Sequence, residues 1–449
     1  MTVKGESLAT PGAGSPSGLS AKQVAAVVAG NAIEFYDFVT YAFFATQIGR
    51  TFFPSHTPGV SLLASLATFG AGFLTRPLGA LVIGRLGDRR GRKPAMLWSF
   101  GLMGAAVIGL PLTPSYASIG VLAPILVVAF RLLQGFALGG EVGPSTAFMM
   151  ESAPLHRRGL YISLQAMSAD ASVMVAGLIG VVLAGALSPA ALESWGWRVA
   201  LLAGAAIIPF GLVMRSRLLE TIHLTQAHDD ERMAPGGYAR IVAAGLAMLA
   251  AATTANYVLD YMTTYASATL GMPTRLALGA TVVVGLCGVI CDPISGWLSD
   301  RFGRKPVLIL PWCVLLVTIF PAFHLLSATR TGAALYVTTA VLAVASTLST
   351  ATVIVTVTEA LPRRMRSGGL GIMYALSICV FGGSTQFLVA WLTRLTGNPL
   401  TPAWYLIGGV SVGLLAILSM PETAPVKTMP HRVAAAKRGQ EQDQIHVLG

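Results

Sequence analysis

Long apolar segments, separated by short loops that carry most of the charge, are the feature that most constrains this chain. About twelve such segments are visible, each close to the ~20 residues that a helix needs to cross a bilayer. Only 11% of the 449 residues are charged, against roughly a quarter in soluble proteins. The sequence therefore predicts an all-α membrane protein. The expected segments are 22–48, 60–84, 95–113, 119–147, 159–187, 196–214, 240–268, 276–298, 306–326, 333–358, 368–394 and 402–420.

Lys and Arg residues gather in alternate loops, which predicts the orientation in the membrane. Basic clusters follow the second, fourth, eighth and tenth segments and occupy the central loop, whereas the other loops hold chiefly Arg50, Arg275 and Arg330. Because cytoplasmic loops carry the excess of positive charge, we expect a multi-pass protein of the cell inner (plasma) membrane with both termini cytoplasmic. The net charge of +11 is explained by these loops, so no nucleic-acid partner is expected.

Composition divides the chain into five parts. Residues 1–21 are rich in Gly, Ser and Pro, which predicts a disordered cytoplasmic start and not a cleaved signal peptide. An N-terminal six-helix bundle is expected over 22–214 and a C-terminal six-helix bundle over 240–420. A polar cytoplasmic loop, 215–239, separates them, and 421–449 is expected to be a polar cytoplasmic tail.

The two predicted bundles repeat each other in sequence. "GRLGDRRGRKP" at 84–94 returns as "GWLSDRFGRKP" at 296–306, and "ESAPLHRRG" at 151–159 is echoed by "EALPRRMRSG" at 359–368. Two motifs at nearly the same offset indicate parallel repeats, which in transporters place a substrate site near the midplane between the halves. The first motif makes these residues equivalent: Asp88 and Asp300, Arg92 and Arg304.

These motifs resemble the major facilitator superfamily, whose most specific signature is the G-x-x-x-D-R-x-G-R-[KR] loop. "RLLQGFALGGEVG" at 131–143 looks like its fourth-helix motif. The first helix, "GNAIEFYDFVTYAFFA", is similar to that of the metabolite–proton symporter family, as are "FGAGFLTRPLGALVIG" and "WGWRVALLAG". The resemblance implies the twelve-helix major facilitator fold and carriers of citrate and tricarballylate, α-ketoglutarate, shikimate, or proline and betaine. The citrate-type carriers look closest.

Three charged residues inside the predicted helices point to proton coupling. Glu34 and Asp37 are three residues apart, so they share one helix face. A carboxyl group that is buried beside another takes up a proton more readily than an exposed one. Arg131, in the middle of the fourth segment, can grip a substrate carboxylate with two parallel hydrogen bonds or hold an acid ionised. The alternative, that these charges only pair and hold helices together, stays open.

Other polar residues of the same segments are expected to line the substrate cavity. Asn31 and Tyr41 extend the face of Asp37, and Gln134 lies one turn after Arg131. Pro77 is expected to loosen the second helix beside Arg76. The predicted substrate-binding residues are Asn31, Tyr41, Arg76, Arg131, Gln134, Gln165, Tyr257, Asp260 and Tyr261.

The loop acids are expected to act differently from the acids within helices. Asp88 and Asp300 can accept hydrogen bonds from a helix N-terminus of the other half, and the resemblance implies a cytoplasmic gate there. Asp292, before Pro293, is expected to belong to this gate as well. The predicted gate residues are Gly84, Asp88, Arg92, Glu151, Asp300, Arg304 and Glu359.

The leading hypothesis is a monomeric secondary transporter that takes up a small organic anion, with citrate or a related tri- or dicarboxylate first, together with protons by alternating access. Alternatives are symport of α-ketoglutarate, shikimate, an aromatic acid, proline or betaine, and efflux by the same fold. Cys287 and Cys291 share a helix face but are expected only to pack. No phosphate loop, metal motif or nucleophile–base pair is visible, so no enzyme, metal or cofactor is expected.

Overall fold

The computed structural model describes most of the chain, and the part it describes is helical and contains no strand. The described residues are 21–57, 59–90, 92–139, 145–146, 149–150, 153–205, 235–362 and 366–428.

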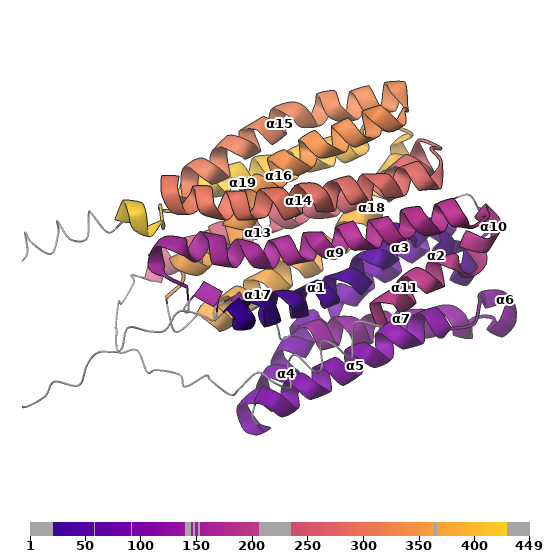
Figure 1. Cartoon of the computed structure of the whole chain (residues 1–449), viewed down its shortest axis with the longest axis horizontal. Helices are drawn as coiled ribbons and strands as arrows, with labels where there is room; N and C mark the ends of the chain where they lie inside the picture. Colours follow the sequence, from indigo (N-terminus) through magenta and orange to yellow (C-terminus); the bar gives the residue numbers. More distant parts are fainter. Residues whose placement is uncertain are drawn as a thin grey trace, which may run out of the picture.

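The first half of the chain forms a bundle in which several predicted segments are broken into consecutive helices (Figure 1). Its helices are α1 (Ala21–Phe43), α2 (Ala45–Phe52), α3 (Val60–Leu74), α4 (Arg76–Arg90), α5 (Arg92–Leu112), α6 (Tyr116–Ile119), α7 (Leu122–Leu138), η1 (Leu155–Arg157), α9 (Arg158–Ala186), α10 (Pro189–Ala191), η2 (Leu192–Gly196) and α11 (Trp197–Ala205).

The second half has longer, less interrupted helices. They are α13 (Pro235–Thr264), η3 (Tyr265–Thr269), α14 (Thr274–Phe302), α15 (Arg304–Thr329), α16 (Gly332–Ala360), α17 (Arg366–Ser377), η5 (Ile378–Gly382), α18 (Gly383–Thr396) and α19 (Thr401–Ser419). Eight helical stretches of the described chain are long and apolar enough to cross a membrane, and 101–112 and 122–138 form shorter apolar helices. With α1–α2 and α11, each of the twelve predicted segments has a helix in the structure.

The second segment, which was expected to be loosened beside Arg76, is interrupted between α3 and α4. Helix α3 ends at Leu74, and α4 begins at Arg76, one residue before Pro77. Proline lacks an N–H group and cannot complete the helical hydrogen-bond ladder. The Thr75 hydroxyl at the break donates instead to the carbonyl oxygen of Leu132 on α7, at 2.6 Å. The break therefore ties the start of α4, and with it Arg76, to α7.

Helices α9 and α14 form the most extensive contact between the two halves and run side by side through the middle of Figure 1. Glycines allow this approach: a Cβ on Gly159 would overlap Ser299 and the backbone of Gly296, and one on Gly285 would meet the backbone of Met174. Small residues let membrane helices pack closely in this way. The start of α1, the end of α19 and the α14–α15 turn lie at one end of the bundle, called here the Arg304 end (Figure 1).

Candidate functional site

A buried polar chain joins α1 to α7. Arg131 is 0% exposed, and its Nη1 donates to Oε1 of Gln134 at 2.7 Å. Gln134 in turn donates from Nε2 to Oδ2 of Asp37. The three-residue spacing of Arg131 and Gln134 places them on one face of α7, toward α1. The structure thus brings together three of the predicted residues.

Aromatic rings surround the charges of this chain. The Arg131 guanidinium carbon lies 3.7 Å from the ring centroid of Tyr41 and 5.0 Å from that of Phe38. Arg76 lies 4.9 Å from the same Phe38 ring and 4.7 Å from Phe73. Two guanidinium groups therefore share one ring, an arrangement that aromatic faces stabilise electrostatically. Arg131, Gln134, Asp37, Tyr41, Arg76, Phe38, Phe69 and Phe73 are called here the Arg131 cluster.

Several nitrogens of the cluster are buried and find no hydrogen-bond partner in the part of the chain that the structure describes. They are Nε and Nη2 of Arg131 and Nε of Arg76. A buried, charged donor without an acceptor is costly, and a guanidinium group presents its donors as a fork that fits a carboxylate. The cluster is therefore chemically suited to bind an anion.

The second half closes over the cluster through α13. The Tyr257 ring lies 6.0 Å from Phe69 and 5.5 Å from Phe73, centroid to centroid. Near the far end from Arg304, the Thr264 hydroxyl donates to the carbonyl oxygen of Ala42 at 3.5 Å. Asp37 is only 5% exposed, so the cluster is closed to solvent in this conformation.

Other predicted substrate residues lie outside the cluster. Asn31 Nδ2 donates to the Gln165 carbonyl oxygen and to Ser168 Oγ on α9, both at 2.9 Å. Thr146 donates to Gln165 Oε1 at 3.0 Å. Tyr261 is buried on α13. Asp260, also on α13, is partly buried, and it interacts electrostatically with Asp170 of α9.

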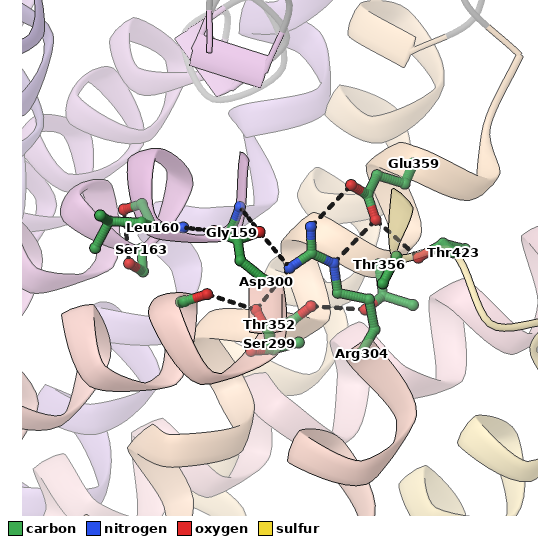
Figure 2. A network of polar contacts seen from close by, with 12 residues as sticks. Gly159, Leu160, Ser163, Ser299, Asp300, Arg304, Thr352, Thr356, Glu359 and Thr423 are labelled. Carbon is green, nitrogen blue, oxygen red and sulfur yellow. Dashed lines mark hydrogen bonds and ion pairs between the residues drawn. The ribbon is translucent and has the colours of Figure 1, made fainter. Parts of the chain in front are cut away.

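A second polar network joins the halves at the Arg304 end (Figure 2). Asp300 Oδ1 and Oδ2 accept hydrogen bonds from the backbone N–H groups of Gly159 and Leu160, at 2.8 and 2.9 Å. These groups open α9, so the predicted contact between a loop acid and a helix N-terminus of the other half is present for Asp300. This contact is the part of the network that links α14 to the first half.

Arg304 is the centre of this second network, called here the Arg304 network. Its Nη1 donates to Asp300 at 2.8 Å and to Ser299 at 2.7 Å. Its Nε and Nη2 donate to the two carboxylate oxygens of Glu359, at 3.1 and 3.0 Å. The Thr423 hydroxyl donates a further hydrogen bond to the Glu359 carboxylate, at 2.8 Å. Every guanidinium nitrogen of Arg304 is paired.

Several predicted residues cannot be placed in either group. The backbones of Glu34, Gly84, Asp88 and Arg92 lie in described helices, but the surroundings of these residues are outside what the structure describes, and Glu151 lies outside the described residues altogether.

Asp292 does not join the Arg304 network: its carboxyl group interacts with Asp170 of α9. Because α14 continues through Pro293 to Phe302, the eight residues between Asp292 and Asp300 separate them by about 12 Å along the helix axis.

Sequence reasoning missed the aromatic part of the Arg131 cluster. Phe69 and Phe73 are four residues apart on α3, and Phe38 follows Asp37 on α1. Their spacing relative to Arg76 is the signal that could have found them, because residues three and four apart lie on one helix face. A second omission is Glu422, which accepts from the backbone N–H of Arg304 at 2.8 Å.

The fold and these two networks define a membrane transporter built of two matching helix bundles. The family model described as sugar (and other) transporter matches residues 22–234 and 233–431. A citrate-proton symporter of Klebsiella pneumoniae is 35% identical over 396 residues, covering 87% of this chain and 89% of that protein. A shikimate transporter of Escherichia coli K12 is 31% identical over 411 residues, covering 88% and 93%.

Two further comparisons agree. A proline/betaine transporter of Escherichia coli K12 is 31% identical over 420 residues, covering 90% of this chain and 84% of that protein. The crystal structure of a D-xylose-proton symporter superposes with a TM-score of 0.72 at 18% identity, covering 90% of this chain and 98% of that one. The chain belongs to the sugar (and other) transporter family of the major facilitator superfamily, with its twelve-helix fold, and it is not an enzyme.

Proposed function

We propose that this protein takes up a small organic anion together with protons, with citrate or a related tri- or dicarboxylate as the first candidate. The observation that carries the proposal is Arg131, a fully buried guanidinium group with two nitrogens that have no hydrogen-bond partner among the described residues. A substrate carboxylate would supply the missing acceptors. The similarity to a citrate-proton symporter at 35% identity supports the same cargo class.

The charges of the Arg131 cluster favour an anion over a cation. Among its described side chains, Arg131 and Arg76 carry two positive charges and Asp37 one negative charge. Protonation of Asp37 removes that negative charge and leaves the positive ones uncompensated. Proton uptake would therefore strengthen the binding of a carboxylate, and loss of the proton would weaken it. This gives coupling without direct contact between proton and substrate.

Asp37 and Arg131 communicate through Gln134. The amide of Gln134 donates to Asp37 and accepts from Arg131. A change in the charge of Asp37 therefore alters the hydrogen bond that Gln134 makes with Arg131. We infer that Asp37 is the proton site, with Glu34 as a second candidate beside it, and that Asn31, Tyr41, Gln165, Tyr257, Asp260 and Tyr261 contribute to the substrate path. Alternating access would then proceed by rocking of the two halves.

The Arg304 network is proposed as the gate at one membrane face. Paired charges that bridge α9 and α14 hold the halves together at that end, and separating them would expose the Arg131 cluster to that side. Positive charge in the adjacent loops supports a cytoplasmic location for this end and for both termini, in the inner membrane. Asp88, Arg92 and Glu151 are proposed to complete the gate, and we expect the protein to act as a monomer.

Uptake into proteoliposomes tests the proposal. Vesicles with an imposed inward proton gradient are offered labelled citrate, α-ketoglutarate, shikimate, an aromatic acid and betaine. We expect a carboxylate to accumulate and the accumulation to collapse with a protonophore. Accumulation of betaine alone would favour the zwitterion class, which Asp260 and Tyr257 would serve, and movement only in the outward direction would identify an exporter.

The change Asp37→Asn separates coupling from binding. An amide keeps the size of the carboxyl group but cannot carry the proton, so uphill accumulation should be lost while exchange of internal for external substrate continues. Glu193→Gln, at an acid outside the Arg131 cluster whose side chain is 44% exposed, is the control and should retain accumulation. Uphill uptake that survives Asp37→Asn would remove Asp37 from the proton path.

A further inference from the structure

A second pair of acids lies at the contact between the halves, away from the Arg131 cluster. Asp170 is in α9 and Asp292 in α14; the carboxyl group of Asp170 lies against Gly288 of α14, one turn from Asp292, and the two acids interact with each other. Asp292 is 1% exposed, and its Oδ2 has no hydrogen-bond partner among the described residues. The transport scheme above does not use either residue.

Two glycines of α14 leave room for this contact. Gly288 lies one turn before Asp292, and a Cβ at Gly288 would overlap the carboxyl group of Asp170. At Gly285, a further turn away, a Cβ would meet the backbone carbonyl of Asp170 at 2.6 Å. Without these two glycines, α9 could not bring an acid so close to α14.

The described groups around the pair carry no positive charge that could balance two carboxylates. From α13 the titratable neighbour is Asp260, and on α14 itself the thiols of Cys287 and Cys291 are the neighbours. Helices α15 and α16 carry no Asp, Glu, Lys or Arg in residues 306–329 and 332–358, and Arg330 lies in the loop between them. The ion pairs between described residues are Arg50–Glu193, Arg304–Asp300 and Arg304–Glu359, which do not include these acids.

Helix α1 also packs on α9 but meets it with neutral groups near this level. Ser172 donates to the carbonyl oxygen of Ala32 at 2.5 Å, and Asn31 bonds to Gln165 and Ser168. Asp37 is directed to Gln134 on α7, and the side chain of Glu34 is outside what the structure describes. The surroundings of the pair are therefore acidic or neutral in every described direction.

The two acids lie side by side, Asp292 buried and Asp170 partly buried, with no cation among their described neighbours. Two carboxyl groups that share such a site do not both ionise readily, and the one that keeps its proton can donate it to the other. We propose that Asp170 and Asp292 form a second proton-binding site, whose single shared proton holds α9 and α14 together and whose loss lets the halves separate. This site concerns proton binding alone and does not depend on the cargo proposed above.

Infrared difference spectroscopy of the purified, substrate-free protein tests the site directly. Raising the pH should remove the carbonyl band of a protonated carboxyl group that Asp37→Asn and Asp260→Asn leave in place. Asp170→Asn and Asp292→Asn should each abolish it. A titrating band that persists unchanged in both of these variants would overturn the proposal, whatever the outcome of the uptake experiments.

Thermal unfolding over a pH series gives a second readout that does not require transport. A proton held only by the folded pair makes the protein less stable as the pH rises above about 4, where exposed carboxyl groups ionise. An amide donates to a carboxylate without needing a proton, so Asp170→Asn and Asp292→Asn should flatten this decline, while Glu193→Gln, at an exposed acid, should not. Equal slopes in the wild type and in both pair variants would contradict a shared proton.

Discussion

Two arginines, Arg131 and Arg304, are both 0% exposed inside the same membrane protein, yet their surroundings differ. Arg304 satisfies every guanidinium nitrogen with Asp300, Ser299 and Glu359. Arg131 satisfies one nitrogen through Gln134 and leaves two without a partner. An arginine whose nitrogens are all hydrogen-bonded stabilises one arrangement of helices. An arginine with unpaired nitrogens can still bind a ligand. The comparison separates a structural contact from a binding site.

The largest expected effect is on the stability of the folded protein, where the two arginines should differ most. Arg304→Gln would leave Asp300 and Glu359 buried without their cation, and removing one partner of a buried pair costs about 3–5 kcal/mol. Arg131→Gln should cost at most about 1 kcal/mol, because a cation with unpaired nitrogens has less to lose. Thermal unfolding midpoints in detergent measure both. Similar losses for the two variants would show that saturation of the hydrogen bonds does not distinguish these arginines.

The next largest effect is on substrate affinity, where we expect Arg131 to matter more than Arg304. Arg131→Lys keeps the charge but loses the planar fork, so the affinity for the transported anion should fall about 10- to 100-fold, the worth of one or two charge-assisted hydrogen bonds. Calorimetric titration of the purified protein measures it. The control is Arg275→Lys, an exposed arginine at the start of α14, which should leave affinity unchanged. Unaltered affinity in Arg131→Lys would remove Arg131 from the site.

A smaller effect concerns the contact that links the halves at the Arg304 end. Asp300→Asn keeps one acceptor for the N–H groups of Gly159 and Leu160 but loses the charge and the second acceptor. We expect a cost of about 1–2 kcal/mol for the closed arrangement, in the range of hydrogen bonds to charged groups. Spin labels on the exposed residues His156 and Arg301 would then show a larger population at long distances.

Glu422→Gln is the matched control for that distance measurement. Glu422 accepts from the backbone N–H groups of Arg304 and Lys305, at 2.8 and 3.1 Å, and so bonds only within the second half. This variant should lower the unfolding midpoint without changing the distance between the labels on η1 and α14. A shift as large as that of Asp300→Asn would mean that the halves are held by the whole network and not by Asp300.

Much of the fold and part of the site were predictable from the sequence, for one physical reason. Lipid requires long apolar helices, so the helices are visible as apolar segments, and a charge inside such a segment stands out. Asp37, Arg131 and Gln134 were found in this way, and the internal repeat identified Asp300 with Arg304.

The remainder depends on how helices face one another, which apolar composition does not record. Phe38, Phe69 and Phe73 are ordinary residues of a membrane helix, so nothing in their type reveals that they hold two guanidinium groups. Asp292 was assigned to the gate by its place before Pro293 in the eighth segment, yet the acid it interacts with is Asp170 on α9. Glu422 lies beyond the last apolar segment, where the sequence offers no pattern to read.

The smallest expected effect concerns an ion pair at the protein surface, which tests whether burial is what makes the pairing of Arg304 stabilising. Arg50 and Glu193 also form an ion pair, at 3.0 Å, but their side chains are 61% and 44% exposed. Water screens such a pair, so Glu193→Gln should change stability by no more than about 0.5 kcal/mol, and the change should vanish in high salt. A loss comparable to that of Arg304→Gln would show that charge pairing stabilises this protein regardless of burial, and the contrast between its two buried arginines would then need another cause.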